Sequence, residues 1–482
     1  MDQKKMPLIE ALKAFAQKHP AYFCVPAHRY EAGVSPVLLE MLGPDLFKYD
    51  LTEAEGLDNL HAPEGAIFES QALAADLFGS ETCFFLVNGT TSGNAAMILS
   101  TVGPGDQILV PSNVHRSVIN ALILSGAEPI TIRPEYDEKW GIYTRLSPQT
   151  VEKALISHPE AKALFLVSPT YEGMESPVGE IAGVCHRHGV PLLVDEAHGS
   201  HFPFSDRLPA GAVREGADLV SQSLHKTGGS MTQSSLLHCQ GNLVDPVRVR
   251  ACVSLMTSTS PSYILMASLD AARHDLSQRG PALLEQALSL ADRARAELSA
   301  IPGLSLLEND DLTRLVFSLS DRGVSGYDLQ KLLHEKGNIS LEMADEKNVT
   351  CVITWGNSQA DIESLVQAVR AAAESCREIR QTAKPERRAD EETAEQPDLS
   401  EAEETAGSTA EEPLQVMTPR EAFYAENEEV PALEAAGRIS AQMIVTYPPG
   451  IPVVRPGQVI PTHVARKCSG SVRVVRTTAM KK

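Results

Sequence analysis

The 482-residue sequence lacks the features that several classes of protein require. No apolar run approaches the ~18–20 residues of a membrane-spanning helix, and residues 1–20 show an amphipathic helix pattern without the long apolar stretch of a secretory signal. The eight cysteines are scattered, with no C-x-x-C pair and no Cys/His spacing typical of zinc. Free thiols fit a reducing compartment, so we expect a cytoplasmic protein without a membrane span.

Positive charge is also scarce. Lys and Arg number 42 against 63 Asp and Glu, which gives a formal net charge of −21 and argues against a nucleic-acid partner. Residues 382–412 alone hold eleven acids and three bases, with few apolar residues. We therefore predict an acidic, disordered linker over 381–412, and the net charge says little about a functional site.

Short apolar runs alternate with helix-length segments between about residues 80 and 240. This alternation predicts an α/β fold with a mainly parallel sheet that helices cover on both faces. Ligands in such sheets bind at the carboxyl ends of the strands. The expected strands are 83–87, 107–110, 129–132, 163–167, 191–195 and 217–223.

The remaining pattern divides the chain further. A helical stretch from Pro281 to about Ala300, three strand-like stretches and a closing helix indicate a small α+β domain. The basic end from Arg466 is expected to be frayed. The predicted units are an N-terminal segment (1–60), a major domain (61–280), the small domain (281–380), the linker (381–412) and a C-terminal domain (413–482).

Four polar features follow predicted strands. In "NGTTSGN" (88–94) a strand runs into a helix, whose N-terminal amides and hydroxyls can bind phosphate. Asp195 closes an apolar strand, Lys226 follows the next in "SLHKTGG", and His115 follows another. Each has an ordinary alternative: a capped turn, a helix cap or ion pair, a solvated amine, and a capping or core histidine.

Together at one sheet edge, these groups match the needs of pyridoxal 5′-phosphate. The cofactor requires donors for its phosphate, a carboxylate for its pyridine nitrogen, an amine for a Schiff base and a ring to stack on. A metal site is the weaker interpretation of Asp195, His198 and His201, because no helix and no further ligand cluster accompany their spacing. We therefore expect no metal.

Longer stretches carry a resemblance to a known family. "DEAHGSH" (195–201), "SLHKTGGSMTQSS" (223–235), "LMTSTSPSYILMASLD" (255–270) and "YPPGIPVVRPGQVI" (447–460) resemble the Orn/Lys/Arg decarboxylases, which are fold-type-I pyridoxal-phosphate enzymes. The match is closest to the compact bacterial arginine/lysine decarboxylase branch and runs from about Phe23 to Ile460.

The resemblance implies a pyridoxal-phosphate-dependent decarboxylase that acts on arginine, lysine or ornithine and makes an amine for polyamine synthesis. It implies a fold-type-I major domain, a small α+β domain and a C-terminal decarboxylase domain, assembled as a homodimer or higher homo-oligomer.

The resemblance also implies residue roles. Lys226 would hold the cofactor covalently, Asp195 would pair with the pyridinium, and His198 would lie near the reacting carbon. His115 would stack on the ring. The phosphate would be held by Thr90, Thr91, Ser223 and His225, with Ser258 or Thr257 reaching a partner's phosphate, and Glu342 would face the distal cationic end of the substrate.

Three departures from the family pattern and two alternative functions stay open. "CVPAHR" (24–29) keeps only Pro26 and His28 of the family's H-x-P-G-H-K, "LDNLH" (57–61) replaces LDDLH, and Gln458 replaces a Glu that could attract a basic substrate. One alternative is another pyridoxal reaction: aminotransferase, C–S lyase or racemase. In an aminotransferase, Arg314 would clamp the substrate carboxylate. The other alternative is a catalytically silent, cofactor-binding regulatory paralogue.

Overall fold

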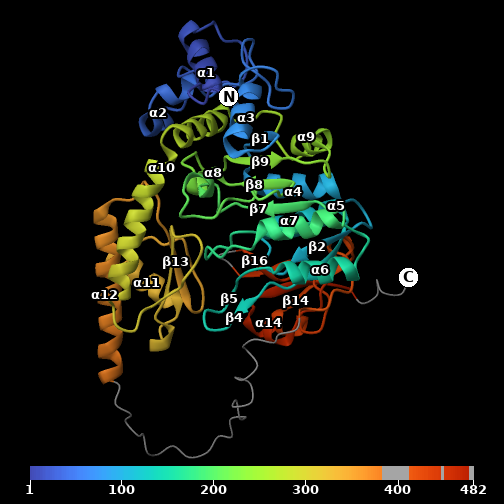
Figure 1. Ribbon diagram of the computed structural model, residues 1–482, viewed down its shortest axis with the longest axis vertical. Helices are drawn as coiled ribbons and strands as arrows, with labels where there is room; N and C mark the ends of the chain where they lie inside the picture. The colour runs from blue at the N-terminus through green and yellow to red at the C-terminus, as the bar shows by residue number, and fades with distance from the viewer. Residues whose placement is uncertain (383–411, 447–449, 477–482) are drawn as a thin grey trace, which may run out of the picture.

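The computed structural model describes residues 1–382, 412–446 and 450–476, so most of the predicted acidic linker (381–412) lies outside the described residues. Figure 1 shows a large sheet at the centre of the molecule, a smaller layer of helices and strands at the lower left, and the C-terminal strands at the lower right.

The central sheet has seven strands. Strands β2, β3, β6, β7 and β8 run parallel, and β9 lies antiparallel between β8 and β1. The strands lie close to their expected bounds, except that β9 was not expected. Their order is β1 (Thr82–Leu86), β9 (Ser235–Cys239), β8 (Leu219–Gln222), β7 (Leu192–Asp195), β6 (Ala161–Val167), β2 (Gln107–Pro111) and β3 (Glu128–Ile132).

Helices cover both faces of this sheet, which explains why its strands are almost continuously apolar. One face packs against α4 (Gly89–Thr101), α5 (Arg116–Ser125) and α9 (Pro246–Leu255). The other face packs against α6 (Pro148–Ser157), α7 (Val178–Arg187), α3 (Ala66–Phe78) and the first half of α10 (Tyr263–Ser299).

The small domain has a four-stranded antiparallel sheet. The end of α10 packs into its core, so this 37-residue helix joins the two cores and passes through the expected boundary at residue 280. The elements are β10 (Ser305–Leu306), β11 (Arg314–Ser318), β13 (Asn348–Val352), β12 (Met343–Ala344), α11 (Gly326–Gly337) and α12 (Gln359–Thr382).

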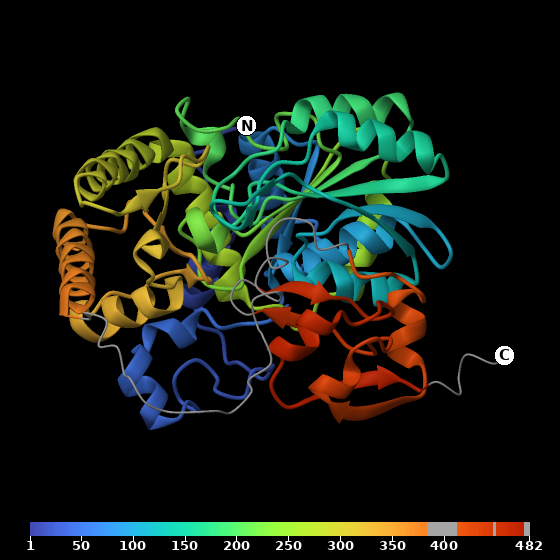
Figure 2. The ribbon, with the colours of Figure 1, turned by 90° about the horizontal axis from the view of Figure 1, so that it is seen from below.

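The C-terminal residues pack against the edge of the central sheet, and Figure 2 shows them as a separate unit from the small domain. The buried Arg455 guanidinium donates to the Pro111 carbonyl (3.1 Å) and to Thr131 Oγ1 (2.9 Å), at the ends of β2 and β3. The elements are α13 (Pro419–Tyr424), β14 (Asn427–Pro431), β15 (Ile444–Thr446), β16 (Ile451–Val454), α14 (Thr462–Lys467) and β17 (Ser471–Val475).

The expectation of a frayed end from Arg466 is wrong for the residues described, because β17 pairs along its whole length with β14. Its alternating Val residues face the C-terminal core, a pattern that the surrounding charges obscured. The remaining short elements are β4 (Tyr136–Asp137), β5 (Ile142–Tyr143), η1 (Asp45–Lys48), η2 (Phe202–Phe204), η3 (Ser320–Arg322) and η4 (Ala432–Ala435).

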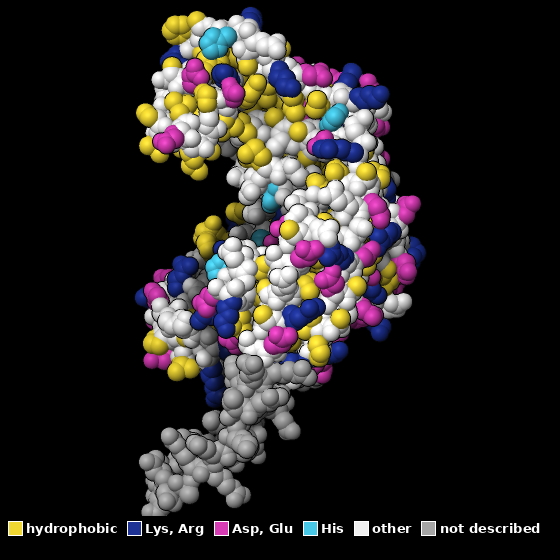
Figure 3. Space-filling model, turned by 90° about the vertical axis from the view of Figure 1, so that its left-hand side faces the viewer, with side chains coloured by type: hydrophobic (Ala, Val, Ile, Leu, Met, Phe, Trp, Pro, Cys, Tyr) yellow, Lys and Arg dark blue, Asp and Glu magenta, His cyan; other side chains and the backbone are white. Residues whose placement is uncertain are grey.

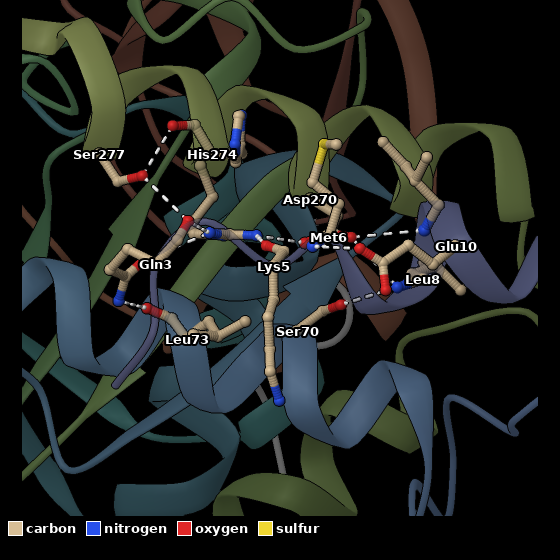
Figure 4. Close-up of polar contacts among 12 residues, drawn as sticks. Gln3, Lys5, Met6, Leu8, Glu10, Ser70, Leu73, Asp270, His274 and Ser277 are labelled. Carbon is tan, nitrogen blue, oxygen red and sulfur yellow. Dashed lines mark hydrogen bonds and ion pairs between the residues drawn. The ribbon is translucent and has the colours of Figure 1, made fainter.

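A buried ion pair on α10 holds the N-terminal helix α1 (Pro7–Lys18) to the rest of the molecule (Figure 4). Helix α2 (Pro36–Leu42) follows α1 in the N-terminal segment. Helix α1 has no side-chain cap of its own, and Asp270 instead accepts bonds from the amides of Leu8 (3.1 Å) and Ile9 (3.4 Å). Arg273 Nη2 lies 2.8 Å from Asp270 Oδ1, and its guanidinium also donates to two carbonyls of the residues before α1.

We expect Asp270→Ala to destabilise the protein by about 3–5 kcal/mol, because it leaves Arg273 buried without its partner and uncaps α1. Thermal unfolding and protease cleavage within α1 would measure the loss. The control is Asp275→Ala on the same helix, whose pair with Arg279 is exposed and should be worth less than about 1 kcal/mol. Equal losses from the two variants would contradict this account of the N-terminal anchor.

Candidate active site

The parallel register brings three strand ends together. Asp195, the last residue of β7, pairs with Val167 of β6 on one side and with Ser221 of β8 on the other. Lys226 follows β8 within the single helical turn α8 (Leu224–Thr227). The carboxyl ends of neighbouring parallel strands therefore place the acid and the amine at one edge, as the sequence predicted.

A cavity of about 330 Å³ opens at this edge. Helix α4, the residue before α5, and the loops that follow β6, β7 and β8 contribute to its wall. Of the residues singled out in the sequence, it is lined by Thr90, Thr91, His115, Asp195, His198, Ser223, His225 and Lys226.

Lys226 is largely enclosed. Its Nζ lies 2.8 Å from His198 Nε2 and 5.5 Å from the centre of the Tyr171 ring. Burial lowers the pKa of Lys226 and the positive charge of Arg314 lowers it further, whereas Asp195 opposes the shift. A lowered pKa favours the neutral amine, which is the nucleophilic form.

Small residues near Lys226 have a packing reason. A Cβ on Gly228 would lie 2.2 Å from Leu224 Cδ1, so only glycine fits after the helical turn. Gly229 has φ +87°, a conformation that other residues rarely adopt, and it lies against Trp355 of the small domain. The chain therefore turns away directly after the amine and leaves it open to the cavity.

Asp195 is buried and held in place from behind. Asn94 Nδ2 donates to Asp195 Oδ2 at 2.7 Å, and the amide of Ala197 donates to Oδ1 at 3.1 Å. Asn94 is in turn fixed by Ser117 and Ser221. A carboxylate kept in one orientation inside the cavity wall suits a cationic ring nitrogen.

The N-terminus of α4 offers an anion site. Its first turn holds no acidic residue, and its amides together with the Thr91 hydroxyl face the cavity end of the helix. Thr90 Oγ1 lies 2.6 Å from Ser223 Oγ, so the two hydroxyls from different strand ends meet there. His225 stands beside them and donates from Nδ1 to the Ser234 carbonyl at 2.9 Å.

His115 caps helix α5, because its Nδ1 accepts from the amide of Ser117 at 3.2 Å. This bond fixes the imidazole in the cavity wall, where burial lowers its pKa. Nearby, the buried Asn113 Oδ1 has no hydrogen-bond partner among the described residues and belongs to the same wall. An unpaired acceptor, an oriented ring, a carboxylate, an amine and an anion site together fit pyridoxal phosphate.

Three residues named from the sequence lie outside this cavity. The Thr257 hydroxyl is buried and donates to the Val253 carbonyl, and Ser258 is exposed on the surface. Glu342 is also exposed and lines a neighbouring groove of about 640 Å³ in the small domain. The expected contacts of Thr257 and Ser258 with a partner subunit stay predictions.

Sequence reasoning missed Asn94, Asn113 and Tyr171 as members of the site. Asn94 lies inside the "GTTSGN" motif, one helical turn after Thr90 and Thr91, which are expected to bind phosphate. Tyr171 follows β6, and its ring lies 4.6 Å from that of His198. Ligands bind at the carboxyl ends of parallel strands, and the residues after β7 and β8 were singled out for that reason. The same reasoning, applied to the residues after β6, would have found Tyr171.

The family departures lie away from the cavity. Gln458 is 2% exposed and its Oε1 accepts from the amide of Arg455 at 2.7 Å, so it holds a turn of the C-terminal segment. His28 faces Asp50 (3.2 Å), and Asp58 accepts amides at the start of α3. These motifs shape the N-terminal and C-terminal segments rather than the cavity wall.

Neither a metal cluster nor a membrane span emerges from the part of the chain that the structure describes. Across those residues, no group of three or more His, Cys, Asp or Glu side chains could hold an ion. His198 faces Lys226, whereas the buried His201 faces Asp311 at 3.2 Å. Within the same residues, no helix is long and apolar enough to cross a bilayer.

Comparisons with known proteins agree with this geometry. The family model of the Orn/Lys/Arg decarboxylase major domain matches residues 6–318, and that of the C-terminal domain matches residues 402–468. The chain belongs to the Orn/Lys/Arg decarboxylase family. It is 40% identical to an arginine decarboxylase of Bacillus subtilis over 470 residues, which cover 95% of this chain and 92% of that one.

Solved structures show the same fold. A lysine decarboxylase of Francisella novicida superposes with a TM-score of 0.79 at 19% identity, covering 98% of this chain and 81% of the other. A serine palmitoyltransferase solved with pyridoxal phosphate superposes with a TM-score of 0.56 at 18% identity, covering 77% and 85%. The expectations of a fold-type-I enzyme, of pyridoxal phosphate as cofactor and of a decarboxylase for a basic amino acid are confirmed.

Proposed function

We propose that this decarboxylase acts on arginine and releases its α-carboxyl group as carbon dioxide, leaving the corresponding amine. The chemistry rests on one observation. The buried amine of Lys226, whose pKa is lowered by burial, shares a cavity with the carboxylate of Asp195, which Asn94 holds in one orientation. The choice of arginine is supported by the near full-length similarity to an arginine decarboxylase. The resulting amine would be a precursor for polyamines.

We assign the cofactor-holding roles as the sequence suggested. Lys226 would bind the carbonyl carbon, Asp195 would pair with the ring nitrogen, and the imidazole of His115 would cover one face of the ring. The phosphate would lie at the start of α4 among Thr90, Thr91, Ser223 and His225. When bound, pyridoxal phosphate supplies a sink for the electron pair that the departing carboxylate leaves on Cα.

The chain's own residues then have defined tasks. The Asp195 carboxylate would keep the ring nitrogen protonated, which makes the electron sink effective. The cavity wall would hold the substrate and orient its Cα–carboxylate bond for cleavage. The reaction consumes one proton, which a group beside Cα must deliver after carbon dioxide leaves. The candidates are Lys226 and His198, which lie 2.8 Å apart in the cavity wall.

Transamination is not favoured by the site. The guanidinium of Arg314 lies 2.7 Å from His198 and 3.3 Å from Asp311, and Arg314 is not among the residues that line the cavity. It is therefore occupied within the protein rather than presented to a substrate carboxylate.

We propose that a second copy of the chain covers the N-terminal segment. Phe23, Val37 and Met41 are 86%, 72% and 76% exposed, and α2 has no buried residue. Figure 3 shows hydrophobic side chains gathered on the upper lobe, above a hollow in the surface. An apolar surface of this kind is typical of an interface, so a monomeric mass in solution would contradict this proposal.

A cytoplasmic location is proposed on chemical grounds. The seven cysteines whose side chains the structure describes are free thiols, which suits a reducing compartment.

Carbon dioxide release should be measured from cofactor-loaded protein with arginine, lysine, ornithine, and neutral and acidic amino acids. We expect release from arginine, and we expect Lys226→Ala to abolish both the release and the absorbance of the lysine-bound cofactor. Lys162→Ala, at an exposed lysine of β6, is the control and should change neither. Release from a different amino acid alone would overturn the substrate, and release from none would overturn the reaction.

Asp195→Asn should lower kcat on the order of 10²–10³-fold, because the amide cannot stabilise the ring cation electrostatically. The α4 phosphate site is untouched, so most of the cofactor should remain bound, as its absorbance after dialysis would show. Asp206→Asn, at an exposed residue, serves as the matched control. Normal turnover by Asp195→Asn would refute the role of this carboxylate.

We also propose that Glu342 attracts the guanidinium of the substrate. The negative charge of Glu342 raises the pKa of Lys226, so its electrostatic field extends from the groove to the amine in the cavity. Glu342→Gln should raise KM for arginine roughly 10–100-fold, with a smaller change in kcat, since a charge-assisted contact is worth about 1.5–3 kcal/mol. The control is Asp361→Asn, an acid of the same groove that is bonded to Ser358; an equal effect from both variants would argue against a specific contact.

A further inference from the structure

Arg314 is the one buried cation that reaches the site from the small domain among the described residues. It opens β11, and its side chain is 1% exposed. Its Nη2 lies 2.7 Å from His198 Nδ1, and the loop after β6 closes over it, since a Cβ on Gly173 would lie 2.9 Å from Arg314 Cγ. The guanidinium thus lies between His198 and Asp311.

The hydrogen-bonding properties of these groups fix the protonation of His198. A guanidinium has only donors, so His198 Nδ1 must be the acceptor and carries no proton. The proton of the neutral ring therefore sits on Nε2, which lies 2.8 Å from Lys226 Nζ. That bond then requires Lys226 Nζ to accept, which only a neutral amine can do.

The doubly protonated imidazolium does not fit here. It would place an N–H on Nδ1 directly against the donors of Arg314. Burial lowers the pKa of His198 well below its ordinary value, and the charge of Arg314 lowers it further. The other titratable groups that act on the ring are His115 from the cavity wall and His201 from its own loop, and both lower the pKa as well.

Asp311 supplies the counter-charge. It is 0% exposed, and its Oδ2 lies 3.3 Å from Arg314 Nε. Its other oxygen accepts from the Thr313 hydroxyl at 2.6 Å and faces His201. Burial alone would raise the pKa of Asp311, but His201 and Arg314 lower it to about 2. The array therefore runs from a carboxylate through a guanidinium to a neutral imidazole and a neutral amine.

We propose that Arg314 is a positioning residue that holds His198 as the neutral Nε2–H tautomer, so that His198 donates a hydrogen bond at the reacting position and does not act as the acid that protonates Cα. Lys226 is left as the acid. Displaced by the substrate, its amine takes a proton from the incoming α-ammonium. After carbon dioxide leaves, that N–H bond breaks as the C–H bond at Cα forms. This assignment of the proton rests on the proposed function, whereas the tautomer of His198 does not.

The test compares Arg314→Met, Arg314→Lys and the wild type as cofactor-loaded proteins. Arg314→Met removes the donor and the positive charge beside Nδ1, so the pKa of His198 should rise and add to the pH profile of kcat an acidic limb that the wild type lacks. The limb should lie below the ordinary pKa of about 6.5, because burial still disfavours the imidazolium. KM should stay within about threefold. Arg314→Lys keeps a donor-only cation and should restore the wild-type profile. Arg293→Met, which removes an arginine paired with Glu297 and Glu363 away from the cavity, is the control.

Two results would overturn the proposal. A rise in KM of about 100-fold with an unchanged pH profile would make Arg314 a clamp for the substrate carboxylate. Unchanged KM and unchanged profile would leave it a purely structural residue. The absorbance of the lysine-bound cofactor, titrated without substrate, gives a second readout. A step below pH 6.5 that appears in Arg314→Met and not in the wild type supports the tautomer assignment even if no amino acid is turned over, and its absence contradicts it.

His198→Gln decides the same question if Arg314→Met fails to fold. A glutamine amide can donate a hydrogen bond but cannot deliver a proton. If His198 is only a donor, kcat should fall about tenfold or less. A loss of 10²–10⁴-fold, the range for removal of a general acid, would show that His198 does protonate Cα.

Discussion

The register between β6, β7 and β8 is the constraint on which the site depends. Parallel strands end at the same edge, so residues that are 31 positions apart in the chain, Asp195 and Lys226, face one cavity. A shift of β7 by a single residue would turn its side chains to the opposite face and bury Asp195 among the helices instead. The unbroken apolar content of these strands, packed by helices on both faces, is what makes that register costly to change.

Burial then determines the charge of each group. Enclosed Lys226 and His198 are driven toward their neutral forms, because a low-dielectric wall disfavours an uncompensated cation. Arg314 cannot release its proton, so it keeps its charge and requires Asp311 beside it. Among these four groups, Lys226 and His198 face the cavity, and the charge-paired Arg314 and Asp311 lie behind them.

The small domain and the C-terminal residues are part of this arrangement rather than additions to it. Residues 309–314 are bound to the loop after β6: the amides of Asp310 and Asp311 both donate to the Gly173 carbonyl, at 3.0 Å. The carbonyl of Gly450 accepts from the amide of Arg116, which follows His115. This bond links the C-terminal segment to the His115 imidazole in the cavity wall. Movement of either unit would displace a residue of the site, which gives a physical reason for a long, continuous α10 between the two cores.

The sequence by itself determined the alternating strands and helices and the placement of Lys226, Asp195 and the Gly-Thr turn at strand ends, because each is a local pattern there. Stretches such as "SLHKTGG" also indicated the family to which the chain belongs. It could not reveal β9, an antiparallel strand whose short apolar run follows a loop of polar residues, nor the burial of Gln458, whose hydrogen bond is made inside a turn.

Only the tertiary structure decided the contacts of Arg314, on which its proposed role rests. In the sequence it is an arginine at the start of a strand, open to several interpretations, and its distance from His198 depends on how two domains pack. The protonation of His198 and Lys226 follows from that contact and from burial, and neither of these is a property of a local stretch of chain.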